Sequence, residues 1–464
     1  MITSKTPLIT LFFVLAISCA SGNENLSVIN SPQDGLQTRK RGTDWPGFLG
    51  PTGDGKSSET GILKDWSSGK LRVVWKKEAG EGYGIGSVAK GRFYHFGRFK
   101  NITILQCLNA ETGEAIWEFE YQSKYKDLYG YDSGPRASPV VDEDRVYIYG
   151  VEGMLHCLNA ISGDVVWKQN LSDRFGVIQN FFGVASSPVV FKDHLIVMVG
   201  GSPDESKLVP PGSLNLVKPN NSGLVALDKV TGEVKYESIH DLASYASLKI
   251  TDIGGQPLLL AWMRESLHGV NPANGETVFE FPWRSRKLES VNASTPVVIE
   301  GQVLISECYG IGSAFLKLNE GNPEVVWSDK KDQRKKSLEA HWNTPIAIGD
   351  SVYGCSGRSS ANAELRCLNW KTGNVNWSQP GLSRSSLTYI DGHFIVLGEH
   401  GKLLLAEASA DQYKVVTEYE PGEGDNGIRL KFPCWAAPIV SHGLLYVRGK
   451  NQLVCFELIP VTKK

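Results

Sequence analysis

One short cassette recurs along most of the chain and constrains its fold more than any other feature. A strand ends at Asn or Asp, a turn containing Gly follows, and a large aromatic residue stands nine positions after the last aliphatic residue of the strand. The clearest copies run from Cys107 to Trp117, Cys157 to Trp167 and Cys367 to Trp377. Looser copies end at Tyr236, Phe279 and Trp327. In a seventh copy Val415 stands where the aromatic residue is expected.

The cassette has a direct physical interpretation. The Asn or Asp side chain can bond to the turn backbone, and Gly supplies the left-handed position of a tight turn. The next strand then delivers a large aromatic side chain to the space between neighbouring sheets. The spacing of about 40–50 residues is that of one four-stranded blade. The chain is therefore predicted to be all-β and built from four-stranded antiparallel blades.

The two ends of the repeat region complete each other. Residues 453–457 supply the strand half of a cassette without an aromatic residue, and residues 71–75 supply an aromatic strand without a turn before it. Pairing them removes two exposed sheet edges. We therefore predict an eight-bladed β-propeller over residues 71–458, closed by pairing of the N-terminal strand with the C-terminal blade.

A second periodic feature gives the same number of blades. Most blades open with a small residue, Pro and two apolar residues, and Pro is tolerated at the first position of a strand. We interpret these segments as the innermost strands. They begin at Ser138, Ser187, Thr295, Thr344 and Ala437, with equivalents that lack Pro at Ser87, Ser247 and Ser386.

The N-terminal region is predicted to direct export. Residues 1–20 resemble a signal peptide, with Lys5, an apolar run over residues 8–17 and then small residues. Either Cys19 becomes the lipidated first residue of a bacterial lipoprotein, or Ser18 and Ala20 form an ordinary cleavage site. The protein is thus expected in a bacterial envelope, periplasmic or anchored to the membrane by lipid. Residues 21–44 are expected to be a flexible tether, 45–70 a lead-in segment packed on the propeller, and 459–464 a C-terminal tail.

The cassettes resemble the pyrroloquinoline-quinone (PQQ) repeat, whose motif is roughly Ala-x-Asp-x-x-Thr-Gly-x-x-x-Trp. Residues 107–117 match it with Cys and Asn at the first and third positions. The resemblance implies a propeller but no single function, because the repeat occurs in catalytic quinoproteins and in non-catalytic propellers such as the BamB type. A third class comprises exported PQQ-like propellers, whose lead-in resembles residues 45–51.

The signs of a quinoprotein enzyme are missing from this sequence. Such enzymes carry two adjacent Cys residues and Ca²⁺ ligands, whereas this chain has no adjacent Cys pair and no carboxylate that aligns with those ligands. We therefore assign no catalytic residue and no metal ligand, and expect no cofactor. PQQ with Ca²⁺ enters only under an alternative function, an alcohol or sugar dehydrogenase. The formal net charge of −2, without long charge runs, argues against nucleic-acid binding.

The protein is therefore expected to act as a non-catalytic binding or scaffold protein of the cell envelope, and a second alternative is a carbohydrate- or polymer-binding propeller. A binding site is expected where the central channel opens, just before the innermost strands. An envelope protein, a small anionic or planar ligand, or a carbohydrate would suit this ring, and a monomer is expected. The alternative is that the residues only plug the axis, with arginines bonded to carbonyl groups. The candidate residues are Tyr83, Arg136, Tyr245, Asn292, His341, Trp342, Asn343, Arg384 and Trp435.

The repeat assigns other conspicuous residues to structure. Cys107, Cys157, Cys367 and Cys455 share one cassette position and are expected in the core. A disulfide between Cys355 and Cys367 and the role of the inserted residues 201–222 stay open. The residues assigned to docking between blades are Trp75, Trp117, Trp167, Trp327 and Trp377.

Overall fold

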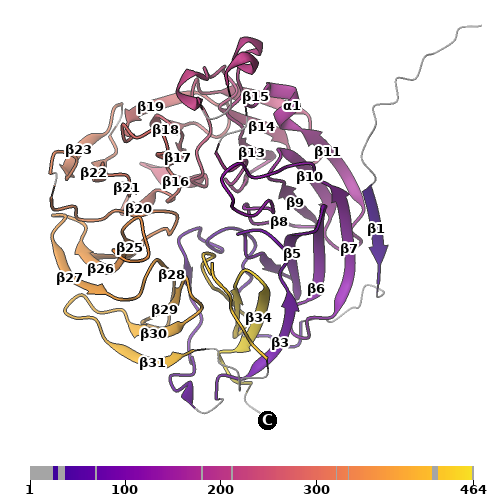
Figure 1. Ribbon diagram of the computed structural model, residues 1–464, viewed down its shortest axis with the longest axis vertical. Helices are drawn as coiled ribbons and strands as arrows, with labels where there is room; N and C mark the ends of the chain where they lie inside the picture. Colours follow the sequence, from indigo (N-terminus) through magenta and orange to yellow (C-terminus); the bar gives the residue numbers. More distant parts are fainter. Residues whose placement is uncertain are drawn as a thin grey trace, which may run out of the picture.

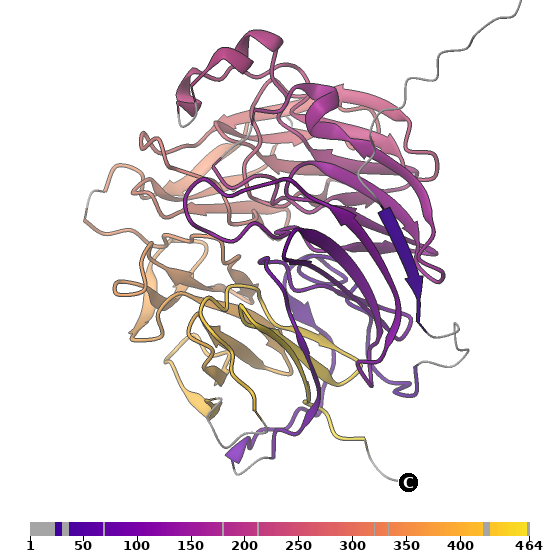
Figure 2. The same ribbon diagram turned by 45° about the vertical axis from the view of Figure 1, so that its right-hand side comes forward.

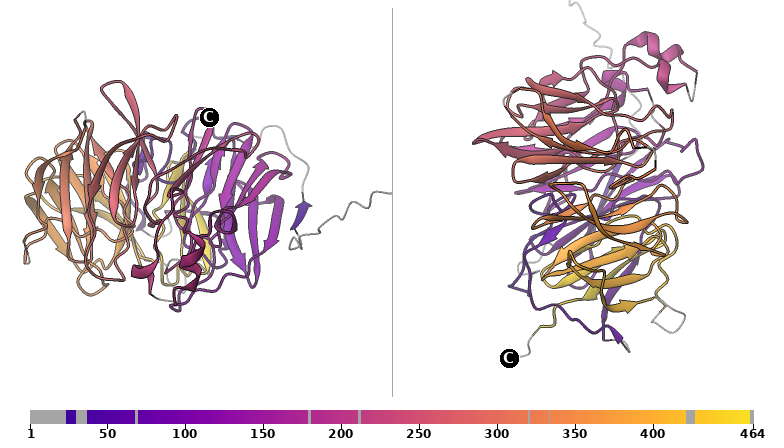
Figure 3. Two further views of the ribbon diagram at one scale, coloured as in Figure 1. Left: turned by 90° about the horizontal axis from the view of Figure 1, so that it is seen from above. Right: turned by 90° about the vertical axis from the view of Figure 1, so that its left-hand side faces the viewer.

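Eight antiparallel sheets surround a central axis in the computed structural model, which confirms the predicted eight-bladed propeller (Figure 1). Figure 3 shows the same ring from the side. The predicted signal peptide and Cys19 lie outside the described residues. The structure describes residues 24–29, 37–67, 70–178, 181–210, 213–319, 321–332, 334–420 and 427–461.

Each blade contributes one strand to each of four layers around the axis. The innermost strands are β4 (Ser87–Ala89), β8 (Val140–Asp142), β12 (Val189–Phe191), β16 (Lys249–Ile253), β20 (Val297–Ile299), β24 (Ile346–Ile348), β28 (Ser385–Ile390) and β32 (Ile439–Ser441). The second strands are β5 (Arg92–Phe99), β9 (Arg145–Tyr149), β13 (His194–Met198), β17 (Gln256–Trp262), β21 (Gln302–Glu307), β25 (Ser351–Ser356), β29 (His393–Gly398) and β33 (Leu444–Arg448). All eight innermost strands lie in the segments that the Pro pattern predicts.

The third and outermost strands carry the two halves of each cassette. The third strands are β6 (Ile102–Asn109), β10 (Met154–Asn159), β14 (Leu224–Asp228), β18 (Ser266–Val270), β22 (Gly312–Lys317), β26 (Glu364–Asn369), β30 (Leu403–Glu407) and β34 (Gln452–Glu457). The outermost strands are β7 (Ala115–Gln122), β11 (Val165–Asn170), β15 (Val234–Ser238), β19 (Thr277–Pro282), β23 (Glu324–Ser328), β27 (Val375–Pro380), β31 (Val415–Tyr419) and β3 (Val73–Glu78).

The ring closes between β3 and β34, as predicted from the two half-cassettes. These strands pair antiparallel, with Trp75 opposite Cys455, and Figure 1 shows them side by side at the bottom of the ring. The same aromatic–Cys pairing occurs within one blade at Trp117 and Cys107. Closure therefore rebuilds an ordinary blade from the two ends of the chain.

Five of the aromatic residues pack on the turn glycine of the next blade, whereas Trp377 donates through its indole Nε1 to the carbonyl of Ser409 at 3.0 Å. Trp75 lies against Gly113, and its indole Nε1 donates to the carbonyl of Ala110 at 2.9 Å. That glycine has φ +73°, so it supplies the left-handed turn and leaves room for the ring. The same ring-on-glycine contact occurs at Trp117–Gly163, Trp167–Gly232, Tyr236–Gly275 and Trp327–Gly373.

The predicted position of the aromatic residue relative to its strand is wrong in two cassettes. In the fifth blade Phe315 lies opposite Trp327, so the strand ends earlier than Leu318 and its turn is longer than in the other blades. In the seventh blade Leu405 lies opposite Thr417, so the position of the missing aromatic residue is Thr417 and not Val415. Turn length cannot be derived from the spacing of residue types alone.

Trp66 of the lead-in segment compensates for the missing aromatic residue. It is 2% exposed within the core that joins the seventh and eighth blades. Its backbone N–H donates to Thr417 Oγ1 at 3.1 Å. A tryptophan from outside the repeat therefore packs between the two blades whose own docking ring is absent.

Hydroxyl groups join successive innermost strands and explain the small residue before Pro. Each hydroxyl accepts a hydrogen bond from a backbone N–H of the preceding blade, which satisfies a donor that stands just before the innermost strand and outside its ladder. The bonds are Ser138 N to Ser187 Oγ, Ser187 N to Ser247 Oγ, Ser247 N to Thr295 Oγ1 and Thr295 N to Thr344 Oγ1.

The lead-in segment crosses the axis at the C-terminal ends of the innermost strands. Trp45 bridges to Val88 on β4, and the short strand β2 (Lys56–Ser57) pairs parallel with β28. Glu59 then accepts hydrogen bonds from the backbone of His442 and Gly443, each at 2.7 Å. Lys249 at the start of β16, in the fourth blade, donates to the carbonyls of Thr52 and Gly53 at 2.6 and 2.8 Å, so the segment contacts opposite sides of the ring.

Part of the expected flexible tether is an ordered strand. Strand β1 (Glu24–Val28) pairs antiparallel along the outer edge of β7 (Figure 1). Glu24 fixes it to the second blade through His156 at 3.1 Å and Lys168 at 2.8 Å. The open edge of β7 supplies backbone partners that the composition of residues 21–44 does not reveal.

The remaining features are a short helix, the insertion and the cysteines. Helix α1 (Leu171–Phe175) follows β11, and the insertion contains two 3-10 helices, Asp204–Leu208 and Leu214–Leu216, which project from the ring in Figure 2.

Cys355 and Cys367 are both buried free thiols, so the disulfide alternative is not realised. In the paired strands Cys355 lies opposite Leu365, and Cys367 lies opposite Tyr353. None of the helices described is long and apolar enough to cross a membrane.

Candidate functional site

A cavity of about 500 Å³ lies at the mouth of the channel, at the N-terminal ends of the innermost strands. The candidate residues that line it are Tyr83, Arg136, Tyr245, His341, Trp342, Asn343, Arg384 and Trp435. Asn292 does not line it. Its side-chain amide donates to the backbone carbonyls of Met263 and Arg264. Its backbone carbonyl accepts a hydrogen bond from Tyr245 N at 2.9 Å. Asn292 therefore supports the wall from behind.

Aromatic rings form a nearly continuous wall around this cavity. Trp342 and Trp435 have centroids 4.5 Å apart, and Tyr83 lies 4.9 Å from Trp435. His341 extends this group at 4.5 Å from Trp342. These rings come from loops of different blades, which the common axis brings together.

Sequence reasoning missed a second group of rings on the same wall. Tyr131 lies 5.1 Å from Phe182, which lies 5.5 Å from Tyr245. Tyr129 and Phe181 also line the cavity, 5.3 Å apart. They belong to loops between blades, where the repeat gives no register. Their clustering at 129–131 and 181–182 was the only sequence signal.

Arg384 and Trp435 share a buried carboxylate. Glu399 is fully buried, and Arg384 Nη2 approaches its Oε2 at 2.7 Å. Trp435 Nε1 donates to the same oxygen at 3.1 Å. The guanidinium also lies over the Trp342 ring at 4.5 Å. Burial alone would raise the pKa of Glu399, but the bonds from Arg384 and Trp435 outweigh it and lower that pKa.

Arg136 closes the loop that carries two cavity tyrosines. It pairs with Asp127 at 3.1 Å and donates to the carbonyls of Asp132 and Gly134. Asp127 also accepts from the backbone N–H groups of Tyr129 and Tyr131. These bonds to carbonyl groups are the arrangement that the plug alternative predicts for an arginine, so Arg136 acts as a support of the wall.

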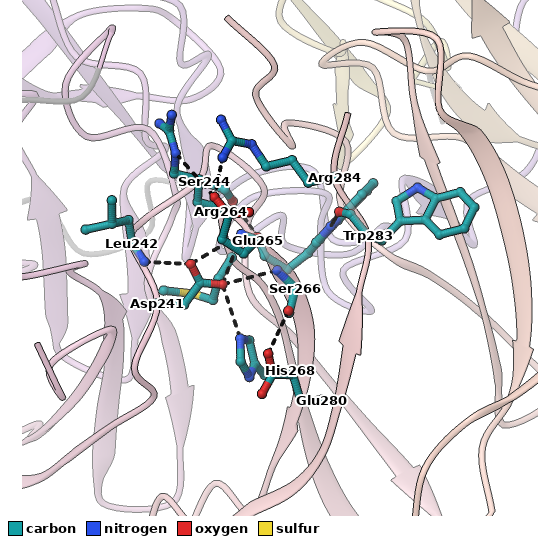
Figure 4. A network of polar contacts seen from close by, with 12 residues as sticks. Asp241, Leu242, Ser244, Arg264, Glu265, Ser266, His268, Glu280, Trp283 and Arg284 are labelled. Carbon is teal, nitrogen blue, oxygen red and sulfur yellow. Dashed lines mark hydrogen bonds and ion pairs between the residues drawn. The ribbon is translucent and has the colours of Figure 1, made fainter. Parts of the chain in front are cut away.

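A polar network fixes the loop that carries Tyr245 (Figure 4). Asp241 accepts hydrogen bonds from the backbone of Leu242, Glu265 and Ser266, and it lies 3.3 Å from His268 Nε2. Farther along, the Tyr245 hydroxyl accepts a hydrogen bond from Phe182 N at 2.8 Å. The ring is therefore held at both ends.

The lead-in segment closes the inner end of the cavity. Phe48 and Leu49 line the cavity and also line a second hollow of about 310 Å³ between the lead-in and the innermost strands. Leu49 has φ +61°, and Gly55 N donates to its carbonyl at 2.9 Å, which fixes a compact turn. The mouth is thus a cup with an apolar floor.

His341 is uncharged near neutral pH. Burial, reinforced by the nearby Arg384 and Arg358 charges, lowers its pKa to about 3. Within the described residues, three buried polar atoms on consecutive wall residues have no hydrogen-bond partner: His341 Nδ1, Trp342 Nε1 and Asn343 Oδ1. A buried polar atom without a hydrogen bond costs free energy, which a bound ligand with matching polar groups would recover.

Glu307 behind the wall is expected to make stability pH-dependent. Burial raises its pKa to about 7, although Ser290 Oγ donates to it at 2.6 Å. The folded chain therefore holds a proton that the unfolded chain has lost, and the free energy of unfolding should fall by an amount on the order of 3 kcal/mol as pH rises from about 4.5 to 7. Glu307→Gln should remove this slope in urea unfolding measured across that range. An unchanged slope would refute the assignment, and Glu418→Gln at an exposed position is the control.

The cavity does not fit the Ca²⁺ that accompanies PQQ in quinoproteins. Ca²⁺ requires several oxygen ligands, but Glu289 is the one acidic residue in the described lining, and it pairs with Arg358 at 3.4 Å. No group of three His, Cys, Asp or Glu side chains in the described ranges is placed to hold a metal ion. No reaction step is therefore assigned to that cofactor.

Comparison with known proteins identifies the repeat. The family model of the outer membrane protein assembly factor BamB matches residues 100–379, which is more than half of the chain. The chain resembles the crystal structure of BamB from Moraxella catarrhalis with a TM-score of 0.55 at 12% identity, over 84% of this chain and 100% of that one. A search of curated proteins finds no match.

A solved enzyme has a comparable overall likeness. Europium-containing methanol dehydrogenase matches with a TM-score of 0.52 at 10% identity, over 90% of this chain and 99% of that one. At such identities these likenesses show the fold alone.

Proposed function

The chain belongs to the family of the outer membrane protein assembly factor BamB, and from this premise we propose that it is an exported, non-catalytic binding protein of the cell envelope. The aromatic cup at the channel mouth is the proposed binding site. Its volume of about 500 Å³ lies in the range of small-molecule sites. The proposed ligand is therefore a small molecule held by rings from several blades.

Two properties of the cup support a binding role without catalysis. The wall is held in place before any ligand arrives, since Arg136, Arg384 and Tyr245 each have protein partners. In addition, the one carboxylate in the described lining, Glu289, is paired with Arg358, and the His341 imidazole has the Tyr309 hydroxyl as its partner at 3.3 Å.

Ligand capture from envelope extract tests this function. The purified chain should carry about one small molecule by native mass spectrometry, and Ala293→Trp, which fills the cavity, should lose it. Ala273→Trp, on an exposed turn, is the matched control and should retain it. Equal occupancy of both variants would refute the site. If the chain oxidises alcohols or sugars and reduces a dye when PQQ and Ca²⁺ are added, the non-catalytic role is refuted.

Export rests on residues 1–20 and on the family, whose name refers to outer-membrane assembly. In cell fractionation the chain should leave the cytoplasm. If Cys19 is lipidated, Cys19→Ser should move the protein from the membrane to the soluble fraction. Retention of the intact chain in the cytoplasm would contradict export.

A further inference from the structure

The charges at the mouth are already balanced within the protein. Three guanidinium groups reach the cavity, and each has a carboxylate partner of its own. The pairs are Arg136 with Asp127 at 3.1 Å, Arg358 with Glu289 at 3.4 Å and Arg384 with Glu399 at 2.7 Å. An anionic ligand would have to compete with these carboxylates, and His341 adds no charge near neutral pH. The electrostatics thus favour a neutral ligand.

The shape of the aromatic wall favours a puckered ring over a flat one. The planes of Trp342 and Trp435 are inclined by 43°, and those of Tyr83 and Trp435 by 38°. Together they form a curved apolar platform. A flat aromatic ligand can stack on only one of these rings, whereas a chair-shaped ring presents C–H groups in more than one direction.

The polar side chains beside this platform call for a ligand that can both donate and accept hydrogen bonds. At the rim, Arg358 and Glu289 have side chains that are 44% and 50% exposed, so a guanidinium and a carboxylate stand side by side at the entrance. Arg358 is also steadied over the Tyr309 ring at 4.5 Å. A hydroxyl group both donates and accepts, and neighbouring hydroxyls can satisfy such a pair together. The unpaired atoms of residues 341–343 lie in the same wall.

We propose that the cup binds a neutral pyranose sugar, with one ring face on Trp342 and Trp435 and its hydroxyl groups toward Arg358 and Glu289. This inference rests on the proposed function and specifies its ligand class. A neutral sugar has an apolar ring face, several hydroxyl groups and no charge. These three properties match the aromatic platform, the Arg358–Glu289 pair and the balanced charges of the cavity. Trp342 and Trp435 supply the stacking energy, and the Arg358–Glu289 pair supplies orientation.

Titration with simple glycosides tests the ligand class. Methyl β-D-glucopyranoside, methyl β-D-galactopyranoside and methyl α-D-mannopyranoside are added while intrinsic tryptophan fluorescence is recorded, with calorimetry as a second readout. At least one should bind with a Kd of about 1 mM, as expected for a ligand of this size. Trp342→Ala should weaken it about 30-fold. Trp342→Phe, which keeps a ring but loses the indole N–H, should have an intermediate effect.

Two further variants separate binding from stability. Glu289→Gln on the exposed rim should weaken the sugar severalfold without changing the melting temperature. Leu208→Ala truncates an apolar side chain that is 86% exposed and outside the cavity lining, and it should leave binding unchanged. If Trp342→Ala and Glu289→Gln both bind the glycoside like the parent chain, the assigned site is wrong.

Sodium benzoate and D-glucuronate distinguish the ways in which the inference can fail. If benzoate or glucuronate binds the parent chain but not Trp342→Ala, and no neutral glycoside binds, the sugar assignment is overturned and the binding function stands. If no probe binds and no small molecule copurifies with the parent chain, both fail.

Discussion

Gly113→Ala is expected to lower the free energy of unfolding by about 2–5 kcal/mol. An added Cβ would lie 2.7 Å from Cγ of Trp75, which is closer than side chains can approach. Overpacking of this kind costs about 1–3 kcal/mol, and the left-handed backbone at φ +73° costs a further ~1–2 kcal/mol for a residue with a side chain. Because Trp75 lies on the closing strand β3, the damage falls where the two ends of the chain hold the ring together.

Gly392→Ala provides a control with the same backbone strain. Gly392 has φ +74°, and an added Cβ there meets no atom within 4 Å. This variant should therefore lose only the backbone component, about 1–2 kcal/mol. Urea unfolding followed by tryptophan fluorescence measures both variants. Equal losses would show that contact between the docking ring and the turn glycine does not stabilise the propeller.

Glu399→Gln is expected to destabilise the chain by about 3–5 kcal/mol, because it leaves the Arg384 charge without its partner. Glu399 is fully buried and accepts from Arg384 Nε at 2.9 Å and from Trp435 Nε1 at 3.1 Å. Since the folded-state pKa of Glu399 is lowered, its stabilising contribution is present above the ordinary pKa of a carboxyl group. It should be lost as pH falls through the lowered folded-state value, and the variant should lack that acid-dependent loss.

The double variant Arg384→Met with Glu399→Leu separates charge from packing. Replacing a buried ion pair by apolar side chains is often neutral, so the double variant should recover most of the stability that Glu399→Gln loses. Chemical denaturation at neutral pH gives the comparison. If the double variant is as unstable as the single one, packing around Glu399 and not the unpaired charge determines stability here.

The architecture was predictable because the chemistry of the repeat is local. In the first blade Asn109 Oδ1 accepts from the backbone N–H groups of Glu111 and Thr112, as the sequence pattern suggests. The eightfold register also placed most of the candidate mouth residues on one cavity, since equivalent positions in a ring face the same axis. Asn292 is the exception, because it only flanks the register position Ala293, which does line the cavity, and its own side chain is bonded to the carbonyls of Met263 and Arg264.

Other parts of the site depend on contacts that no local pattern encodes. Tyr131 and Phe182 reach the wall from loops outside the repeat. The partner of Arg384 is a glutamate on the hairpin of its own blade whose role no motif marks. Trp66 packs beside Thr417, which lies more than 300 residues farther along the chain.

The sequence by itself determined the all-β ring, its eight blades and its closure, because turn chemistry and strand alternation act over a few residues and repeat at a fixed period. Tertiary structure alone decided that the lead-in segment closes one end of the channel and that β1 occupies the edge of β7. It also decided that the mouth arginines are neutralised within the wall. These outcomes depend on side chains meeting across blades, where geometry and burial, rather than local sequence, select the partners.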